Sequence, residues 1–305
     1  MVYTMPEFLE RRYNKESRTI LSVISLISYV LTKVAVTVYA GGLVFQQVFG
    51  IKELWGIDFF WIAAIGLVLI TALYTIFGGM KSVLYTSVLQ TPILLLGSII
   101  ILVLGLKAVG GWDQVMQICS AEPVNEYGDK MTDLMRDLRD PQYPWLGALV
   151  GSAVIGFWYW CTDQFIVQRV LSGKNEKEAR RGTIFGAYLK LLPVFIFLIP
   201  GMIAYALNVK SGGAFLPVDA NGVAISDAAF PTLVAKLLPA GFKGLVVCGI
   251  LAALMSSLAS LFNSSAMLFT IDFYKRLRPQ TSEKSLVRIG QIATVVIVIL
   301  GILWI

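Results

Sequence analysis

Long apolar stretches, separated by short charged or polar segments, dominate the pattern of the chain. A helix needs about 20 predominantly apolar residues to cross the hydrocarbon core of a membrane. By this criterion, helices that cross the membrane are predicted over 20–48, 57–77, 88–106, 146–166, 183–206, 243–273 and 286–305. The pattern therefore predicts an all-α, polytopic membrane protein with about seven transmembrane helices. Two long polar loops, 107–145 and 207–242, interrupt the series.

The composition fits this interpretation, because 57% of the residues are hydrophobic and only 14% are charged. Histidine is absent, which excludes Ser-His hydrolases, histidine-ligated metals and histidine proton relays. The three cysteines, Cys119, Cys161 and Cys248, form no close pair, so neither a zinc pattern nor a disulfide framework is predicted. We therefore expect a membrane protein that is not an enzyme and that needs no cofactor.

The placement of lysine and arginine orients the predicted helices. Basic residues are dense in four segments on one side of the membrane, at 11–18, at Lys81, at 169–181 and at 275–288. The segments on the other side are longer and carry fewer basic residues. We therefore expect the N-terminus to be cytoplasmic, both long loops to be extracellular and the C-terminal end of the chain to be extracellular. The net charge of +6 indicates topology in a multi-pass plasma-membrane protein, not nucleic-acid binding.

A polar stripe runs along the predicted helix 243–273. Ser256, Ser260, Asn263 and Ser264 stand at i, i+4, i+7 and i+8, which places them on one face of the helix. One interpretation is packing, since small and hydroxyl residues are common between membrane helices. The other is that the adjacent hydroxyls of Ser256 and Ser257 belong to a site for a hard cation. Such a site would need further oxygen ligands from other segments.

Two lysines fall inside predicted membrane helices, Lys33 near the middle of the first and Lys190 within the fifth. A lysine at this depth costs about 2.5 to 3.5 kcal/mol on insertion scales. Either residue could extend its ammonium group to the membrane surface, which suits Lys190 better than Lys33. A charge that cannot reach the surface usually faces a polar pathway, which predicts a functional or network role.

The fourth predicted helix ends in an aromatic run, Trp158–Tyr159–Trp160, followed by polar residues that include Asp163. The run suits an aromatic belt at the membrane interface. It equally suits a sugar-binding platform, because flat rings cover the apolar face of a pyranose. Asp163 lies six residues before Arg169, so an ion pair between these two residues at an inner gate is one interpretation.

Six blocks spread over the chain resemble the solute:sodium symporter family, and more closely its sodium/glucose cotransporter branch. They are TMPEFLERRY (4–13), YVLTKVA (29–35), ITALYTIFGGMKSVLYTSVLQT (70–91), WYWCTDQFIVQRVLSGKN (158–175), YLKLLPVFIFLIPGMIA (188–204) and ALMSSLASLFNSSAMLFTIDFYKRLRP (253–279). The resemblance implies a LeuT-like bundle of ten core helices in two inverted repeats. It also implies that residues 1–305 form a single transmembrane domain, truncated at both ends, that contains core helices three to nine.

The resemblance also implies a set of site residues. Ala253, by its carbonyl oxygen, and Ser256 and Ser257, by their hydroxyls, match the main sodium site of the family. The family's remaining ligands come from its first core helix. Tyr159 matches the residue that stacks on the sugar as an inner gate, Trp160 lies beside it, and Lys190 matches a donor to the sugar hydroxyls.

Three positions depart from the pattern of the sugar branch. Ser87 replaces an aspartate that many members carry, and Ala259 replaces a threonine that some carry. Both positions are associated with a second sodium site, so at most one sodium per solute is expected. Gly156 replaces a polar residue that often faces the substrate, which leaves hexose, inositol and related polyols open as the solute.

These observations predict sodium-coupled symport of a glucose- or galactose-like sugar by alternating access, with sodium as the coupling ion. The expected partners are a small-molecule sugar, sodium and the lipid bilayer. One alternative is a sodium symporter for another solute, such as inositol or another polyol. The other is a membrane sensor module that keeps the fold and does not transport.

Overall fold

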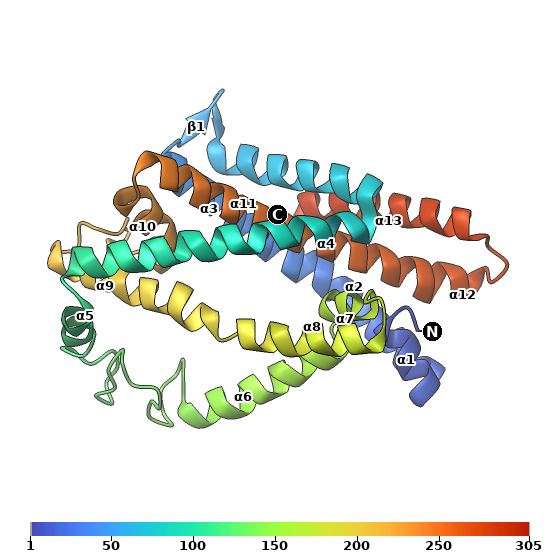
Figure 1. Cartoon of the computed structure of the whole chain (residues 1–305), viewed down its shortest axis with the longest axis horizontal. Coiled ribbons are helices and arrows are strands. Elements are labelled where there is room, and N and C mark those ends of the chain that lie inside the picture. Colours follow the sequence, from blue (N-terminus) through green and yellow to red (C-terminus); the bar gives the residue numbers. More distant parts are fainter. Residues whose placement is uncertain (1, 305) are drawn as a thin grey trace.

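The computed structural model describes residues 2–304, apart from the side chains of Ser82 and Leu89. It is an elongated bundle of helices that run along the long axis of the molecule (Figure 1). Within the described residues, seven helical segments are long and apolar enough to cross a membrane, as the sequence predicts. These segments are Lys15–Phe49, Phe59–Lys81, Val83–Val109, Trp145–Thr162, Glu176–Lys210, Ala240–Leu277 and Glu283–Trp304. The expected end of the last helix, Ile305, lies outside the described residues.

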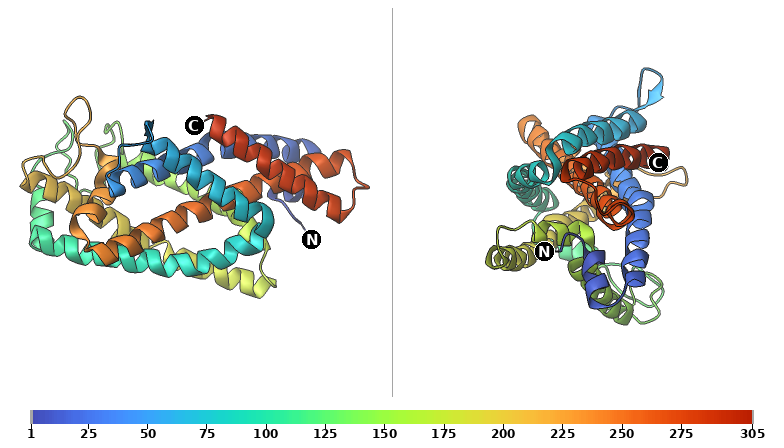
Figure 2. Two further views of the ribbon diagram at one scale, coloured as in Figure 1. Left: turned by 90° about the horizontal axis from the view of Figure 1, so that it is seen from above. Right: turned by 90° about the vertical axis from the view of Figure 1, so that its right-hand side faces the viewer.

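The first half of the chain forms three of these segments. Its elements are α1 (Met5–Arg12), α2 (Lys15–Ser28), the π-helix η1 (Tyr29–Val34), α3 (Ala35–Phe49), β1 (Glu53–Leu54), β2 (Ile57–Asp58), α4 (Phe59–Val109) and α5 (Trp112–Cys119). The α4 element contains two arms, because the chain turns at Gly79 with φ of 54°. Glycine adopts this conformation without a steric penalty, so the chain can bend at Gly79. In the left view of Figure 2 the two arms diverge from this bend.

The second half forms the other four segments. Its elements are α6 (Trp145–Phe157), η2 (Trp158–Thr162), α7 (Gln164–Leu171), α8 (Glu176–Leu189), η3 (Val194–Leu198), α9 (Ile199–Lys210), η4 (Ser226–Ala228), α10 (Ala229–Leu237), α11 (Ala240–Met267), η5 (Leu268–Tyr274), α12 (Lys275–Leu277) and α13 (Glu283–Trp304). The π-helices η1 and η2 contain Lys33 and the aromatic run, respectively. Single π-helical turns within α-helices are often found at functional sites.

The fourth helix ends four residues earlier than predicted, at Thr162 instead of residue 166. Asp163 has an extended backbone (φ −72°, ψ 110°), and its side chain accepts a hydrogen bond from the amide of Phe165. It is therefore the N-cap of a new helix, α7, which changes the direction of the chain. The two long loops also contain structure that the sequence pattern did not indicate. Part of the first loop forms α5, and part of the second forms α10.

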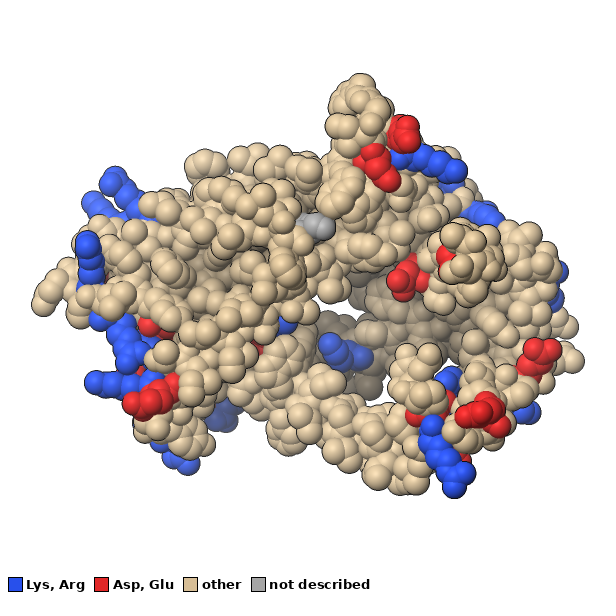
Figure 3. Space-filling model, turned by 180° about the vertical axis from the view of Figure 1, so that it is seen from behind, with Lys and Arg blue, Asp and Glu red and all other residues tan. Residues whose placement is uncertain are grey.

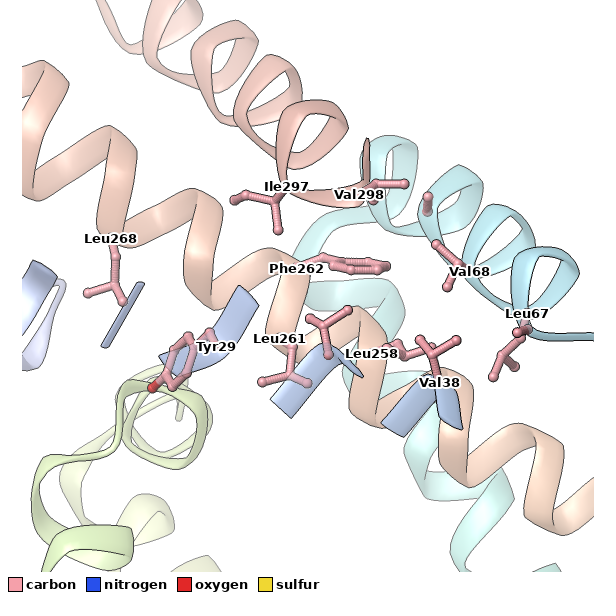
Figure 4. Close-up of a cluster of buried hydrophobic side chains, with 13 residues drawn as sticks. Tyr29, Val38, Leu67, Val68, Leu258, Leu261, Phe262, Leu268, Ile297 and Val298 are labelled. Carbon is pink, nitrogen blue, oxygen red and sulfur yellow. The ribbon is translucent and has the colours of Figure 1, made fainter. Parts of the chain in front are cut away.

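Two hydrophobic clusters hold the helices together. In one, Phe262 of α11 packs among side chains of η1, α3, the first arm of α4 and α13, including Val68 and Ile297 (Figure 4). The other joins the second arm of α4 to α5, α9, α10 and α11. By contrast, no residue of α6 is buried. In the face shown in Figure 3, most of the charged side chains lie toward the two ends of the long axis, as expected for helices that cross a bilayer.

Candidate functional site

The serine stripe of α11 faces other helices. Ser256, Ser260 and Ser264 are all buried. The hydroxyl of Ser256 shares a hydrogen bond of 2.6 Å with the hydroxyl of Ser87, which lies on the second arm of α4. The hydroxyl of Ser264 donates to the side-chain oxygen of Gln168 at 2.8 Å. Packing therefore accounts for most of the stripe, since each of these hydroxyls meets a polar partner from another helix.

Ser257 differs from the stripe. It is only half-buried, as is Ala253 one turn earlier. Among the described residues, no hydrogen bond involves the Ser257 hydroxyl, whereas the Ser256 hydroxyl is bonded to Ser87. Hard cations take hydroxyl and carbonyl oxygens as ligands. The free hydroxyl of Ser257, next to the hydroxyl of Ser256, is compatible with part of a sodium site. The remaining oxygen ligands of such a site would come from another segment.

The lysine in the first membrane helix is part of a network. The Nζ atom of Lys33 lies 2.6 Å from Oδ2 of Asp163, whose side chain is completely buried. The hydroxyl of Tyr29 donates to the other oxygen of Asp163 and accepts from the amide of Phe165 at 3.0 Å. The ammonium group also lies 4.7 Å from the ring centre of Trp158. The network role predicted for Lys33 is thus present in the structure, and it joins η1 to the start of α7.

The interpretation that Asp163 and Arg169 form an ion pair is wrong. Asp163 pairs with Lys33 instead. The guanidinium of Arg169 donates through Nη2 to the hydroxyl of Ser260 at 2.5 Å, and it lies 5.2 Å from the ring centre of Phe165. Asp163 ends one helix and caps the next, so the spacing of six residues does not bring the two side chains together. Burial lowers the pKa of the Arg169 guanidinium.

The aromatic run and the second intramembrane lysine come together. The Nζ atom of Lys190 lies 4.6 Å from the ring centre of Tyr159, a cation–π contact between the fourth and fifth membrane segments. The ring of Trp160 stands edge-on to that of Tyr159, with 5.5 Å between their centres. Trp160 and Lys190 are exposed and Tyr159 is half-buried. These three residues therefore form an accessible surface with two rings and a cation.

A second polar cluster, which sequence reasoning missed, lies at the end of the bundle that holds α1. The Arg18 side chain lies 2.6 Å from Asp272 and 2.5 Å from Glu10. The hydroxyl of Thr4 donates to Asp272 at 2.9 Å. The hydrogen bond from Arg18 lowers the pKa of the Glu10 carboxyl. No local signal identifies this cluster, because Asp272 is more than 250 residues from its partners.

Beside this cluster, a cavity of about 630 Å³ opens between the first arm of α4, α11, η5 and α13. Its lining includes Asn263, Thr270 and Gln291. Gln291 donates to the carbonyl oxygen of Ile76 at 3.1 Å. The hydroxyl of Thr270 is buried and has no hydrogen-bond partner in the described structure. A few polar side chains therefore stand among the mainly apolar residues that line this cavity.

Comparison with protein families gives a match over residues 1–305 to the model described as the sodium:solute symporter family. The chain is 40% identical over 319 aligned residues to the sodium/myo-inositol cotransporter 2 of Bos taurus. It is 39% identical to the sodium/mannose cotransporter SLC5A10 of Bos taurus and to the sodium/glucose cotransporter 4 of Danio rerio. Each alignment covers 100% of this chain and 46%, 52% and 48% of the respective relative. The chain therefore spans about half the length of these relatives.

Among solved structures, the chain resembles a Na⁺-coupled sialic acid symporter in a substrate-bound outward-open state. The TM-score is 0.81 at 23% identity, and the match covers 99% of this chain and 60% of that chain. At this identity the likeness concerns the fold, which is LeuT-like, as the sequence resemblance implies. The match leaves part of the sialic acid symporter uncovered, just as the alignments leave part of each cotransporter uncovered.

Proposed function

The chain belongs to the sodium:solute symporter family, and on that basis we propose that it provides part of a sodium-coupled symporter for a sugar or a closely related polyol. The family consists of symporters, not of enzymes. The observation that supports the solute assignment is the contact of Lys190 with Tyr159, beside Trp160. Two rings can cover the apolar face of a pyranose or cyclitol, and an ammonium group can donate to its hydroxyls.

Sodium binds, in this proposal, at Ala253, Ser256 and Ser257 as a transported ion. The free hydroxyl of Ser257 and the carbonyl oxygen of Ala253 face the same side of α11, one turn apart. Sodium supplies a positive charge that these oxygens hold together with ligands from another core helix. Binding there favours the outward-open arrangement that accepts the solute, so coupling is a difference in affinity between two states of the protein. The membrane potential adds about 2.3 kcal/mol per charge for each 100 mV.

The Lys33–Asp163–Tyr29 network acts as an inner gate in this scheme. It holds η1 of the first membrane segment against the start of α7, directly after the aromatic run. Opening toward the cytoplasm would separate these segments and expose Asp163 to water. The orientation that we propose, with the N-terminus cytoplasmic and 107–145 and 207–242 extracellular, places this network on the inner side. In this proposal the chain is a single transmembrane domain.

Two solute classes have specific support. The aromatic run followed by Cys–Thr–Asp–Gln favours a glucose- or galactose-like sugar. The most similar relatives include proteins named for myo-inositol and mannose, which favours testing a cyclitol and a second hexose. Gly156 leaves open space beside the aromatic run, since no atom lies within 4 Å of a Cβ added there. A solute bound at the aromatic run could therefore place a substituent beside Gly156, in the space that a polar side chain at this position would fill.

Counterflow of labelled solutes in proteoliposomes tests the proposal. The 305-residue chain is compared with a completed form, in which the same chain is joined to the core helices of a relative that lie outside the aligned part. Glucose, galactose, mannose and myo-inositol are each offered with sodium or with choline. Sodium-dependent exchange of one of these solutes by the completed form is the expected result. Exchange of all of them without sodium, or of none under any condition, would contradict the proposal.

A pair of variants distinguishes a loss of solute binding from a general destabilisation of the helix. Tyr159→Ala removes the ring that contacts Lys190, so the apparent solute affinity is expected to fall at least about tenfold, which corresponds to about 1.4 kcal/mol. Phe157→Ala is the matched control, because its ring is 73% exposed and lies two residues away on the same helical segment. Equal losses in both variants would show that the aromatic run supports the helix and not the solute.

A further inference from the structure

Five basic residues line a second cavity, of about 560 Å³, at the end of the bundle that holds α1 and α12. Two of them form ion pairs, Arg11 with Glu7 at 2.7 Å and Arg18 with Glu10 at 2.5 Å. Among the described residues, no carboxylate lies within 4.0 Å of the other three basic residues, which are Lys15, Lys275 and Arg276. The lining therefore has an excess of positive charge, because its acidic residues, Glu7 and Glu10, are already paired.

The three unpaired cations stand where membrane segments begin or end. Lys15 is the first residue of the segment Lys15–Phe49, and Lys275 and Arg276 lie just before the end of the segment Ala240–Leu277. In Figure 3 this end of the molecule is on the left, and basic side chains gather there. Residues at the ends of membrane helices lie at the depth of the lipid head groups. In the orientation proposed above this is the cytoplasmic side, where the leaflet contains anionic lipids.

The mainly apolar cavity of about 630 Å³ adjoins this basic cavity, since Tyr3, Ile271 and Lys275 belong to the walls of both. Phe77, on the first arm of α4, and Val287, on α13, also line the apolar cavity, and they are 82% and 63% exposed. The apolar cavity therefore opens to the surface of the bundle between two membrane helices. Its volume lies within the range of about 300–1,000 Å³ that is usual for ligand pockets.

We propose that the two cavities together bind one anionic phospholipid of the inner leaflet. Its headgroup phosphate lies among Lys15, Lys275 and Arg276, and one of its acyl chains lies in the apolar cavity between α4, η5 and α13. This inference goes beyond solute transport and rests only on the orientation that we propose above.

The combination of the two cavities favours a lipid over a soluble anion. A free phosphate would use the basic cavity alone, whereas a phospholipid also removes its acyl chain from water in the apolar one. Lys275 stands at the junction, where it is half-buried and its Nζ atom lies 5.7 Å from the ring centre of Tyr3. Arg276 donates to the hydroxyl of Thr19 at 2.8 Å, which joins α12 to α2. A lipid bound here would hold these two helices together and raise the unfolding temperature.

Native mass spectrometry in a neutral detergent tests the proposal by counting lipids bound to the 305-residue chain and to the completed form. The expected result is one phosphatidylglycerol per chain, bound at least about tenfold more tightly than phosphatidylcholine, which has no net charge. Thermal unfolding with inorganic phosphate, which has no acyl chain, should show no comparable stabilisation. Equal binding of the two lipids, or equal stabilisation by phosphate, would overturn the proposal.

Two double variants test the basic cavity. Lys15→Gln/Lys275→Gln removes two of the unpaired cations, so the affinity for phosphatidylglycerol is expected to fall at least about tenfold. Lys174→Gln/Lys177→Gln is the matched control, because it removes the same charge from two exposed lysines for which the described structure gives no ion pair. Equal losses in the two double variants would overturn the site, because binding would then depend on net charge alone.

Gly290→Leu tests the apolar cavity with all the charges in place. A Cβ added at Gly290 lies 3.6 Å from the hydroxyl oxygen of Thr270, and both residues line the cavity, so a leucine there occupies space that the acyl chain needs. Binding of phosphatidylglycerol is therefore expected to weaken, and undiminished binding would contradict the placement of the chain. Loss of lipid binding in the completed form would also overturn the proposal, since another segment would then fill the cavity. The readout is lipid binding, so a failure of solute exchange bears on the proposed function alone.

Discussion

The Lys33–Asp163 pair gives the sharpest prediction about stability. Its two ends differ in burial: the Asp163 side chain is completely buried, whereas 25% of the Lys33 side chain is exposed. Lys33→Met keeps the length and the apolar contacts of the side chain but leaves the buried carboxylate without its cation. Breaking a buried ion pair from one side costs about 3–5 kcal/mol, because the remaining charge stays in a medium of low dielectric constant. We expect this variant to lose about that much of its free energy of unfolding.

The reverse change should cost less. Asp163→Asn keeps an acceptor for the Tyr29 hydroxyl, and Lys33 retains its contacts with the rings of Tyr29 and Trp158 at 4.5 and 4.7 Å. Because the ammonium group is partly exposed, we expect a loss of about 1–3 kcal/mol. The double variant Lys33→Met/Asp163→Asn removes both charges and should be more stable than Lys33→Met alone.

Reversible unfolding in mixed detergent micelles, followed by circular dichroism, measures all three variants in one double-mutant cycle. Lys177→Met is a suitable control, because Lys177 is exposed and the described structure gives it no ion pair. The reasoning would be refuted by Lys33→Met costing no more than Lys177→Met, or by equal costs for the two single variants. Either result would mean that the carboxylate finds water or another cation that the structure does not contain.

Two further predictions concern helix packing and the loop 107–145. A Cβ added at Gly97 would lie 2.5 Å from Cγ2 of Val246, so Gly97→Ala should cost about 1–3 kcal/mol of unfolding free energy. Gly151 has open space around it, so Gly151→Ala is the control and should be neutral or stabilising by about 1 kcal/mol. Thermal unfolding in detergent compares the two variants, and equal shifts would contradict the packing of α4 on α11. Asp140 accepts from the amide of Tyr143, a hydrogen bond that is the largest cause of the lowered pKa of its carboxyl. Since this pKa is below its ordinary value, the stabilisation is complete above the ordinary pKa and is lost as the pH falls through the folded-state value. The protection factor of the Tyr143 amide, which compares its exchange rate with the intrinsic rate at the same pH, should therefore fall at acidic pH in wild type and show no such change in Asp140→Asn.

The sequence pattern predicted the membrane helices well because apolar length is a local property. Six of the seven segments run to within a few residues of the expected ends or somewhat beyond them. The fourth helix ended early because of Asp163, whose role depends on Lys33, a residue 130 positions away. A local pattern cannot indicate that an aspartate in an apolar segment is the partner of a lysine in another helix.

The same limit applies to the candidate site. The periodicity of α11 correctly indicated that Ser260 and Ser264 face other helices. It could not indicate that Arg169 and Gln168, from α7, are their partners. The pairing of Asp163 with Arg169 was wrong because the chain changes direction between the aspartate and the arginine. The sodium and sugar assignments came from the resemblance to a family, and they stay predictions about Ser257 and Tyr159.

The measurement that tests the central claim most directly is the binding of the preferred solute to the completed protein at equilibrium, as a function of sodium concentration. Wild-type protein should bind the solute at least about tenfold more tightly in sodium than in choline, a coupling free energy of about 1.4 kcal/mol. Ser257→Ala should lose this dependence while it still binds the solute weakly. Solute binding with equal affinity in sodium and in choline would contradict the account, because the ion and the solute would then not be coupled.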